Sequence, residues 1–187
     1  MSRVAVFGGS FNPPHVGHVL ACALLLSVEE VDRVLVVPTY VHPFAKPLAP
    51  FEDRATMCEL AMAWMPGVEV SRVEAELGGE SRTLRTLETL ARAHPDWALR
   101  LIIGADILAE APRWFGFDAI TKLAPPIVLG RAGAQDHRAA GPALLPEVSS
   151  TQVRAAVARG AWSDLEKLVP RAVLAHVRAR GLYGTPD

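Results

Sequence analysis

The pattern that most constrains the fold is an alternation of short β-branched runs with longer stretches of helical character. The runs predict buried strands at residues 3–7, 33–37, 68–73, 99–103 and 127–129. The spacing of apolar residues predicts helices at residues 15–30, 52–64, 83–93, 114–123, 151–159 and 172–180. Because buried strands joined by crossover helices form a parallel sheet covered on both faces, the chain is expected to be α/β with a doubly wound parallel sheet.

Length and charge limit the kinds of protein that remain. The chain has 187 residues, half of them apolar, which fits one domain spanning residues 1–187. Its 19 basic and 20 acidic side chains give a net charge of −1, so no overall field attracts nucleic acid or an anionic membrane. Small-molecule partners are therefore expected, and a homo-oligomer stays open.

Localisation and redox state follow from two further features. The apolar run at residues 4–7 is too short for a signal-peptide core or a membrane span, so the protein is expected to be cytosolic. Cys22 and Cys58 lack CxxC spacing and the density of a disulfide scaffold. Both cysteines are expected to be reduced and buried.

The segment GGSFNPPHVGH, residues 8–18, follows the first predicted strand. Its two glycines allow close approach of a ligand, and its two prolines preset the backbone for the start of a helix. The free N–H groups of that helix can bind an anion. His15 and His18 share one face of its first turn, where both can donate to phosphate oxygens. Two alternatives are a plain turn with two surface histidines, and a zinc site of His15, His18 and Cys22.

Two further segments carry polar residues at expected strand or helix ends. Ser149, Ser150 and Thr151 precede a helix that contains Arg154, a second cradle for a polyanion or simply a helix cap. Gly104 and Asp106 follow the fourth predicted strand, where the carboxylate can accept from hydroxyl groups or can cap a helix.

Residues 8–18 resemble the (T/H)xGH signature of the nucleotidyltransferase superfamily, in the GGTFDPxHxGH form of bacterial nicotinate-mononucleotide adenylyltransferases. The resemblance implies a Rossmann-like nucleotidyltransferase fold. It further implies that His15 and His18 bind the ATP phosphates and stabilise the transition state. Residues expected to contact ATP in this segment are Gly8, Gly9, Ser10 and Phe11. Asn12 departs from the family, which usually has Asp there; it keeps a side chain that can cap the helix.

Other segments extend the resemblance to residues 4–184. Residues 149–154 are similar to the family's SSTxIR motif, which implies that Ser150, Thr151 and Arg154 bind ATP phosphates. Residues 104–114 resemble its GxD…W segment, which implies nucleoside contacts by Gly104 and Asp106 and stacking of Trp114 on a pyridine ring. Residues 81–87 resemble SYTxDTL, which implies Thr83 near the pyridine carboxyl group.

Departures from the family concentrate around the expected acceptor site. Arg82 and Arg85 replace its Tyr and Asp, and are interpreted as solvated on a helix face in preference to favouring an acidic substrate. The loop at residues 41–46 replaces its PPHK, although His42 and Lys46 still form a plausible pair for phosphate groups. Arg54 either supports the site or lies on a helix surface.

The expected reaction is attack by the phosphate of nicotinate or nicotinamide mononucleotide on the α-phosphorus of ATP. His15, His18, Lys46 and Arg154 are the expected catalytic residues, and His42, Thr83 and Trp114 the expected acceptor contacts. Mg²⁺ is expected to be carried by ATP, with no metal site of the protein's own. The alternatives are transfer to another acceptor such as phosphopantetheine, and a silent nucleotide-binding regulatory module.

Overall fold

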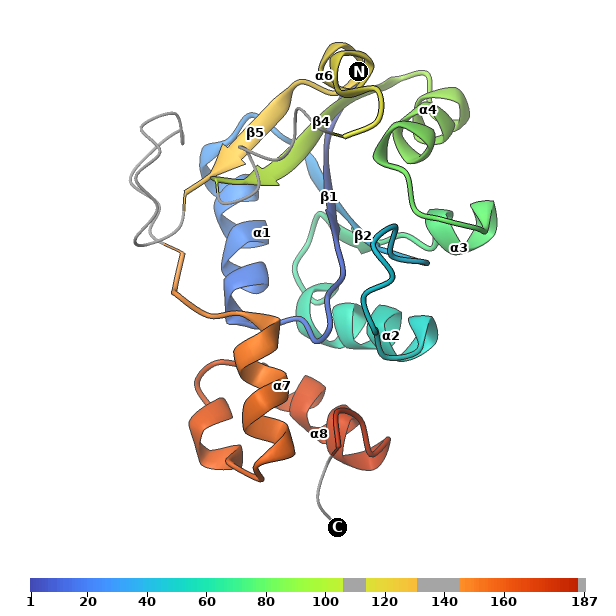
Figure 1. The fold of residues 1–187 in the computed structure, drawn as a ribbon. Helices are drawn as coiled ribbons and strands as arrows, with labels where there is room; N and C mark the ends of the chain where they lie inside the picture. The colour runs from blue at the N-terminus through green and yellow to red at the C-terminus, as the bar shows by residue number, and fades with distance from the viewer. Residues whose placement is uncertain (106–113, 131–144, 185–187) are drawn as a thin grey trace.

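A parallel sheet forms the centre of the computed structural model, which describes residues 1–105, 114–130 and 145–184 (Figure 1). Five strands lie in the order β3-β2-β1-β4-β5. They are β1 Ser2–Gly9, β2 Arg33–Pro38, β3 Val68–Val70, β4 Trp97–Gly104 and β5 Pro126–Leu129. Each neighbouring pair is parallel, which confirms the predicted doubly wound α/β sheet.

Strand β1 occupies the position where the strand order reverses. Val6 lies opposite both Leu35 of β2 and Leu101 of β4, so the carboxyl ends of these three strands share one edge of the sheet. Open α/β sheets bind ligands outside that edge, at the reversal point. The residues that follow β1 and β4 are therefore the ones placed to form a site.

Both faces of the sheet are covered because its central strands are apolar on both sides. Ala5 of β1 belongs to a buried cluster with residues of α1 (Val16–Val28) and α2 (Phe51–Met62). Val4 and Val6 belong to a second cluster with residues of α3 (Val73–Leu77), α4 (Thr83–Ala93) and α6 (Phe117–Leu123). Figure 1 shows α1 on one side of the sheet and α3 and α4 on the other.

The end of the chain forms a separate group of helices. They are α7 Ser150–Ala158, the 3-10 helix η2 Trp162–Leu165 and α8 Arg171–Ala179. Figure 1 shows α7 and α8 at the opposite end of the molecule from the N-terminus. Helix α8 packs against α2, and the Val16 N–H donates to the Leu168 carbonyl at 2.8 Å. The C-terminal segment is thus joined to the turn that follows β1.

Two element boundaries differ from the sequence prediction. The predicted strand at residues 68–73 is wrong beyond Val70, because Val73 begins the short helix α3 and is buried in the second cluster. The predicted helix at residues 114–123 begins only at Phe117, since Gly116 is its N-cap in the left-handed conformation, with φ of 71°. Helices α3 and η2 are short and were not predicted.

Both cysteines are buried and free, as expected. Burial raises the pKa of the Cys22 thiol to about 12, and its Sγ lies 3.7 Å from the Met62 Sδ. The zinc alternative is not supported, because the described residues contain no group of three or more His, Cys, Asp or Glu side chains that could hold a metal. In the same part of the chain, no helix combines the length and apolarity that a membrane crossing requires.

Candidate active site

The turn between β1 and α1 has an unusual backbone and a buried aromatic side chain. Phe11 has φ of 44°, in the left-handed region that non-glycine residues rarely occupy. The residue is 2% exposed, and its ring makes edge contacts with the rings of Phe7 and His18, at centroid distances of 5.4 and 4.9 Å. Phe11 therefore packs within the turn, and its left-handed backbone is held there by these ring contacts.

The two histidines of the turn interact with each other. His15 is the N-cap residue of α1, and its backbone N–H donates to the His18 Nδ1 at 3.1 Å. The rings lie 3.8 Å apart, and His15 is 2% exposed. Since the His18 Nδ1 accepts, the neutral ring carries its proton on Nε2 and can donate from there. The two histidines therefore lie side by side as expected, with His15 buried and His18 partly exposed.

The predicted C-terminal motif lies directly against this turn. The Ser150 Oγ donates to the Pro13 carbonyl at 2.8 Å, although the two residues are 137 positions apart. Arg154 donates to the Asn12 carbonyl at 2.8 Å and to the Thr151 Oγ1 at 3.3 Å. A guanidinium has five N–H donors, so Arg154 keeps others for a ligand. The fold thus joins the two motifs, from opposite ends of the chain, that were predicted to bind anions.

Helix α7 begins with a capping box. The Ser149 Oγ accepts from the Gln152 N–H at 3.2 Å, and the Ser149 N–H donates to the Gln152 Oε1 at 2.8 Å. Ser149 is therefore the capping residue. Because the cap does not use Thr151 or Arg154, both can also contribute to a phosphate site.

A cavity of about 860 Å³ opens at the carboxyl edge of the sheet. That volume suits a nucleotide-sized ligand. Many of the expected site residues line it: Gly8, Gly9, Ser10, His42, Lys46, Thr83 and Trp114. Within the described part of the chain, its lining excludes Phe11, His15, His18, Gly104, Ser150, Thr151 and Arg154. Asp106 lies outside the described residues.

The two glycines at the end of β1 meet different surroundings. A Cβ on Gly9 would lie 3.2 Å from the Phe11 ring, so Phe11 packing favours glycine there. A Cβ on Gly8 would have no neighbour within 4 Å, and Gly8 lines the cavity. Neither internal packing nor a positive φ requires a glycine at position 8. A Cβ at this position would instead occupy space in the cavity.

The loop after β2 carries the expected His42–Lys46 pair to the cavity. The Phe44 N–H donates to the His42 Nδ1 at 3.2 Å, which requires that nitrogen to be unprotonated. Burial, together with the charges of Lys46 and Arg54, lowers the pKa of His42. His42 is therefore neutral at pH 7, with its proton on Nε2, and Lys46 supplies the positive charge of the pair.

Glu74, at the start of α3, organises the cavity wall. Its carboxylate accepts from the Tyr40 N–H at 3.0 Å, from the Thr86 hydroxyl at 3.1 Å and from the Ser81 hydroxyl. These bonds connect the loop after β2 with α4, which begins at Thr83. Sequence reasoning missed Glu74 because its partners become neighbours only in the fold.

Two arginines near the cavity are engaged in local contacts. Arg82 is exposed, lines the cavity and pairs with Glu80 at 2.8 Å. Arg85 donates to the Leu77 and Gly78 carbonyls at 2.8 and 2.9 Å, where α3 ends. Arg85 therefore caps the C-terminus of α3, a role that the sequence interpretation did not anticipate.

Arg54 is a buried structural residue that sequence reasoning underestimated. It is 1% exposed and donates to the Ser10 and Ala49 carbonyls, each at 2.9 Å. It therefore ties the turn after β1 to the loop that carries Lys46. A signal was present, because Arg54, Met57, Cys58 and Ala61 share the helical spacing of one buried face.

Comparison with known proteins agrees with this arrangement. The cytidylyltransferase-like family model matches residues 6–156. A probable nicotinate-nucleotide adenylyltransferase of Anaeromyxobacter sp. (strain K) is 48% identical over 97% of this chain and 96% of its own length. A protein with the same name from Myxococcus xanthus is 45% identical over 97% of this chain and 95% of its own length.

A solved structure shares the fold at low sequence identity. The Plasmodium falciparum nicotinic acid mononucleotide adenylyltransferase complexed with NaAD superposes with a TM-score of 0.84, covering 100% of this chain and 99% of its own. Its identity of 16% supports a common fold alone. The family follows from the closer relatives and from the family model: the chain belongs to the nicotinate-nucleotide adenylyltransferases, within the cytidylyltransferase-like family.

Proposed function

We propose that this protein transfers the adenylyl group of ATP to nicotinate mononucleotide, forming the dinucleotide and pyrophosphate in NAD biosynthesis. The observation that carries the proposal is the contact between the turn after β1 and the start of α7. There the Ser150 hydroxyl and the Arg154 guanidinium bond to the Pro13 and Asn12 carbonyls, each at 2.8 Å. Residues 8–10 of the same segment line the cavity, so phosphate donors adjoin a space for substrates.

The chemistry is an in-line displacement at phosphorus. A phosphate oxygen of the mononucleotide attacks the α-phosphorus of ATP, forming a new P–O bond. The bond from the α-phosphorus to the bridging oxygen breaks, and pyrophosphate leaves with that electron pair. Such transfers depend on positioning and on stabilising the charge that develops, so no covalent enzyme intermediate is needed.

Donors from separate elements share the stabilisation of charge. His18 supplies its Nε2–H, Arg154 supplies N–H groups not used by Asn12 and Thr151, and Lys46 supplies a mobile positive charge. The N-termini of α1 and α7 add backbone donors and the positive ends of their dipoles. His15 holds the His18 ring by its backbone N–H.

Mg²⁺ fits this site as an ion bound to ATP. The described residues offer no cluster of three or more acidic or imidazole ligands, and the donors at the turn are cationic or neutral. Phosphate oxygens are the natural Mg²⁺ ligands in such a setting. When bound, the ion would neutralise charge on the triphosphate.

The acceptor contacts are proposed from the residues that line the cavity. Trp114 offers an aromatic surface for the pyridine ring, and Thr83 and His42 offer polar groups. Relatives that share 45–48% identity carry nicotinate in their names, which favours the acid over the amide.

Pyrophosphate release by purified protein with ATP and Mg²⁺ tests the proposal. The acceptors to compare are nicotinate mononucleotide, nicotinamide mononucleotide and phosphopantetheine, at equal concentrations. We expect the highest kcat/KM with nicotinate mononucleotide. Higher turnover with phosphopantetheine would transfer the assignment to another acceptor class, and ATP binding without release for any acceptor would indicate a regulatory module.

A further inference from the structure

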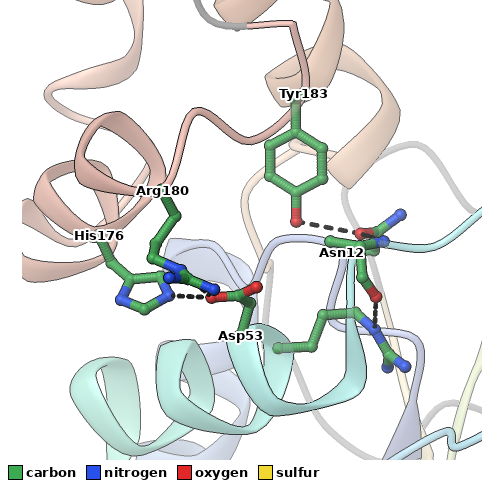
Figure 2. Close-up of polar contacts among 7 residues, drawn as sticks. Asn12, Asp53, His176, Arg180 and Tyr183 are labelled. Carbon is green, nitrogen blue, oxygen red and sulfur yellow. Dashed lines mark hydrogen bonds and ion pairs between the residues drawn. The ribbon is translucent and has the colours of Figure 1, made fainter.

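Asn12 is a buried residue whose side chain connects three segments. It is 3% exposed. Its Oδ1 accepts from the Ala49 N–H at 3.0 Å, and its Nδ2 donates to the Pro47 carbonyl at 3.4 Å. The Oδ1 also accepts from the Tyr183 hydroxyl at 3.0 Å (Figure 2). The expectation that Asn12 caps α1 is wrong, because His15 occupies the N-cap position.

The orientation of the Asn12 amide follows from its partners. A backbone N–H can only donate, so the atom facing Ala49 must be the oxygen. The nitrogen then faces the Pro47 carbonyl, which can only accept. An aspartate, the usual family residue, could accept from Ala49 and Tyr183 but could not donate to Pro47. Asn12 therefore suits this chain's own loop.

The main chain of Asn12 contacts Arg154, one of the residues proposed to bind phosphate. Its carbonyl accepts from Arg154 at 2.8 Å, while its side chain holds residues 47 and 49. Lys46 immediately precedes Pro47 and lines the cavity. Asn12 therefore contacts Arg154 directly and Lys46 through the adjacent Pro47, and both of these cations are proposed to bind phosphate.

Tyr183 completes this arrangement from the far end of the chain. Its hydroxyl bonds to Asn12 at 3.0 Å, and burial raises its pKa, so the hydroxyl stays a proton donor at neutral pH. A separate contact fixes the preceding helix: the Asp53 Oδ1 accepts from Arg180 and bonds to His176, each at 2.9 Å (Figure 2). The C-terminal segment therefore makes two separate contacts: His176 and Arg180 fix α8 on Asp53, and Tyr183 bonds to Asn12 beside the candidate site.

We propose that Tyr183 and Asn12 are positioning residues, which set the Lys46 loop relative to Arg154 for adenylyl transfer. This inference rests on the proposed function. Tyr183 fixes the Asn12 amide, and Asn12 holds Pro47 and Ala49, the segment that directly follows Lys46. Neither side chain needs to touch the substrates, because the effect reaches them through Lys46.

A double-mutant cycle between Tyr183→Phe and Lys46→Met tests the proposal. Tyr183→Phe removes one hydroxyl and is expected to lower kcat about five- to tenfold, with KM for ATP nearly unchanged. In the Lys46→Met background the same change should lower kcat less than about twofold, because the group being positioned is gone. Equal effects in both backgrounds would overturn the proposal.

Arg180→Gln is the matched control. It breaks the guanidinium bond to Asp53 on the same C-terminal segment and leaves Asn12 untouched. We expect a lower Tm, kcat within about twofold of wild type, and simple additivity with Lys46→Met. A coupling to Lys46 as large as that of Tyr183→Phe would show that general docking of α8 explains the effect, and would contradict the proposal.

Hydrogen exchange separates failure of this inference from failure of the proposed function. This measurement needs no catalytic activity. The Ala49 amide should exchange faster in Asn12→Ala and Tyr183→Phe than in wild type, and its exchange rate should be unchanged in Arg180→Gln. Unaltered exchange in all three variants would refute the positioning role. Wild-type protein that releases no pyrophosphate would instead refute the function itself.

Discussion

The two sides of the candidate site are built in contrasting ways. On the side proposed to bind phosphate, His15 and Asn12 are 2% and 3% exposed, and Arg154 and Ser150 bond to main-chain carbonyls. On the acceptor side, large apolar side chains lie open to solvent: Phe44 is 75% exposed and Phe115 is 74% exposed. Both phenylalanines line the cavity.

This difference suggests that the buried side stabilises the transition state and the exposed side binds the acceptor. Donors that act on a developing charge need fixed positions, and the buried, hydrogen-bonded turn provides them. Loops on the proposed acceptor side, such as residues 41–46, tolerate changes in sequence more readily than a buried turn does. Changes on the phosphate side should therefore lower kcat, and changes on the acceptor side should raise KM.

The largest effect is expected for His18→Gln. A glutamine at this helix position can still accept from the His15 N–H, as in a capping box, but lacks the imidazole donor. We expect kcat to fall about 10²- to 10³-fold, with ATP affinity and Tm close to wild type. His18→Ala, which also loses the cap, should unfold at a lower temperature. Parallel loss of ATP affinity and kcat in His18→Gln would show that the histidine acts in ground-state binding.

The next effect concerns the space above Gly8. A Cβ there meets no protein atom within 4 Å, so Gly8→Val should fold with an unchanged Tm. Its side chain would occupy the cavity, and KM should rise more than about tenfold for at least one substrate. Thermal melts and initial-rate kinetics measure both quantities.

Gly17→Ala is the contrasting control for Gly8. Its Cβ would lie 3.1 Å from the His15 ring, so the strain falls within the protein. Alanine gains up to about 1 kcal/mol of helix propensity over glycine, but the buried His15 ring must shift to admit the Cβ, so a net loss of about 1 kcal/mol in unfolding free energy is expected. If Gly8→Val lowers stability and Gly17→Ala does not, the assignment of ligand space at Gly8 is wrong.

A smaller effect is expected on the acceptor side, from Trp114→Leu. Loss of an aromatic surface should raise KM for the mononucleotide about two- to tenfold while kcat stays near wild type. Trp64→Leu is the control, since Trp64 is 69% exposed and does not line the cavity. A fall in kcat with constant KM would place Trp114 functionally with the phosphate side.

The smallest effect concerns pH and His42. Because burial and the charges of Lys46 and Arg54 lower its pKa, the unfolded chain takes up a proton near pH 6.5 that folded His42 still lacks. Folding stability should therefore fall as the pH drops below about 6.5. Melts at pH 7.5 and 5.5 should show a smaller decrease of Tm for His42→Asn than for wild type. An identical decrease would mean that His42 titrates normally.

Local signals in the sequence were sufficient for the sheet, and they singled out the two motifs that are proposed to bind anions. The β-branched runs identified all five strands, because buried parallel strands are apolar on both faces. Val73 misled this reasoning, since a β-branched residue that continues a strand pattern can equally begin a buried helix. The contacts of Ser150 and Arg154 with the turn after β1 come from the structure, because the family resemblance implied only that both residues bind ATP phosphates.

Residues whose roles depend on distant partners could not be identified from sequence. Asn12 contacts Ala49 and Tyr183, which are 37 and 171 positions away, and no local pattern encodes those pairs. The role of Glu74 was missed for the same reason, because its carboxylate accepts hydrogen bonds from Tyr40, before it in the chain, and from Thr86, after it. Arg54 is different, because its helical spacing with Met57 and Ala61 was a local signal of burial, although the sequence interpretation left a surface position open.

The most direct test of adenylyl transfer follows the α-phosphorus. Purified protein would be incubated with Mg²⁺, nicotinate mononucleotide and ATP labelled at that phosphorus, and the products would be separated by chromatography. The account predicts that the label appears in the dinucleotide, in equal amount to unlabelled pyrophosphate. Label that stays in ATP, or that appears in AMP or ADP while no dinucleotide forms, would contradict it.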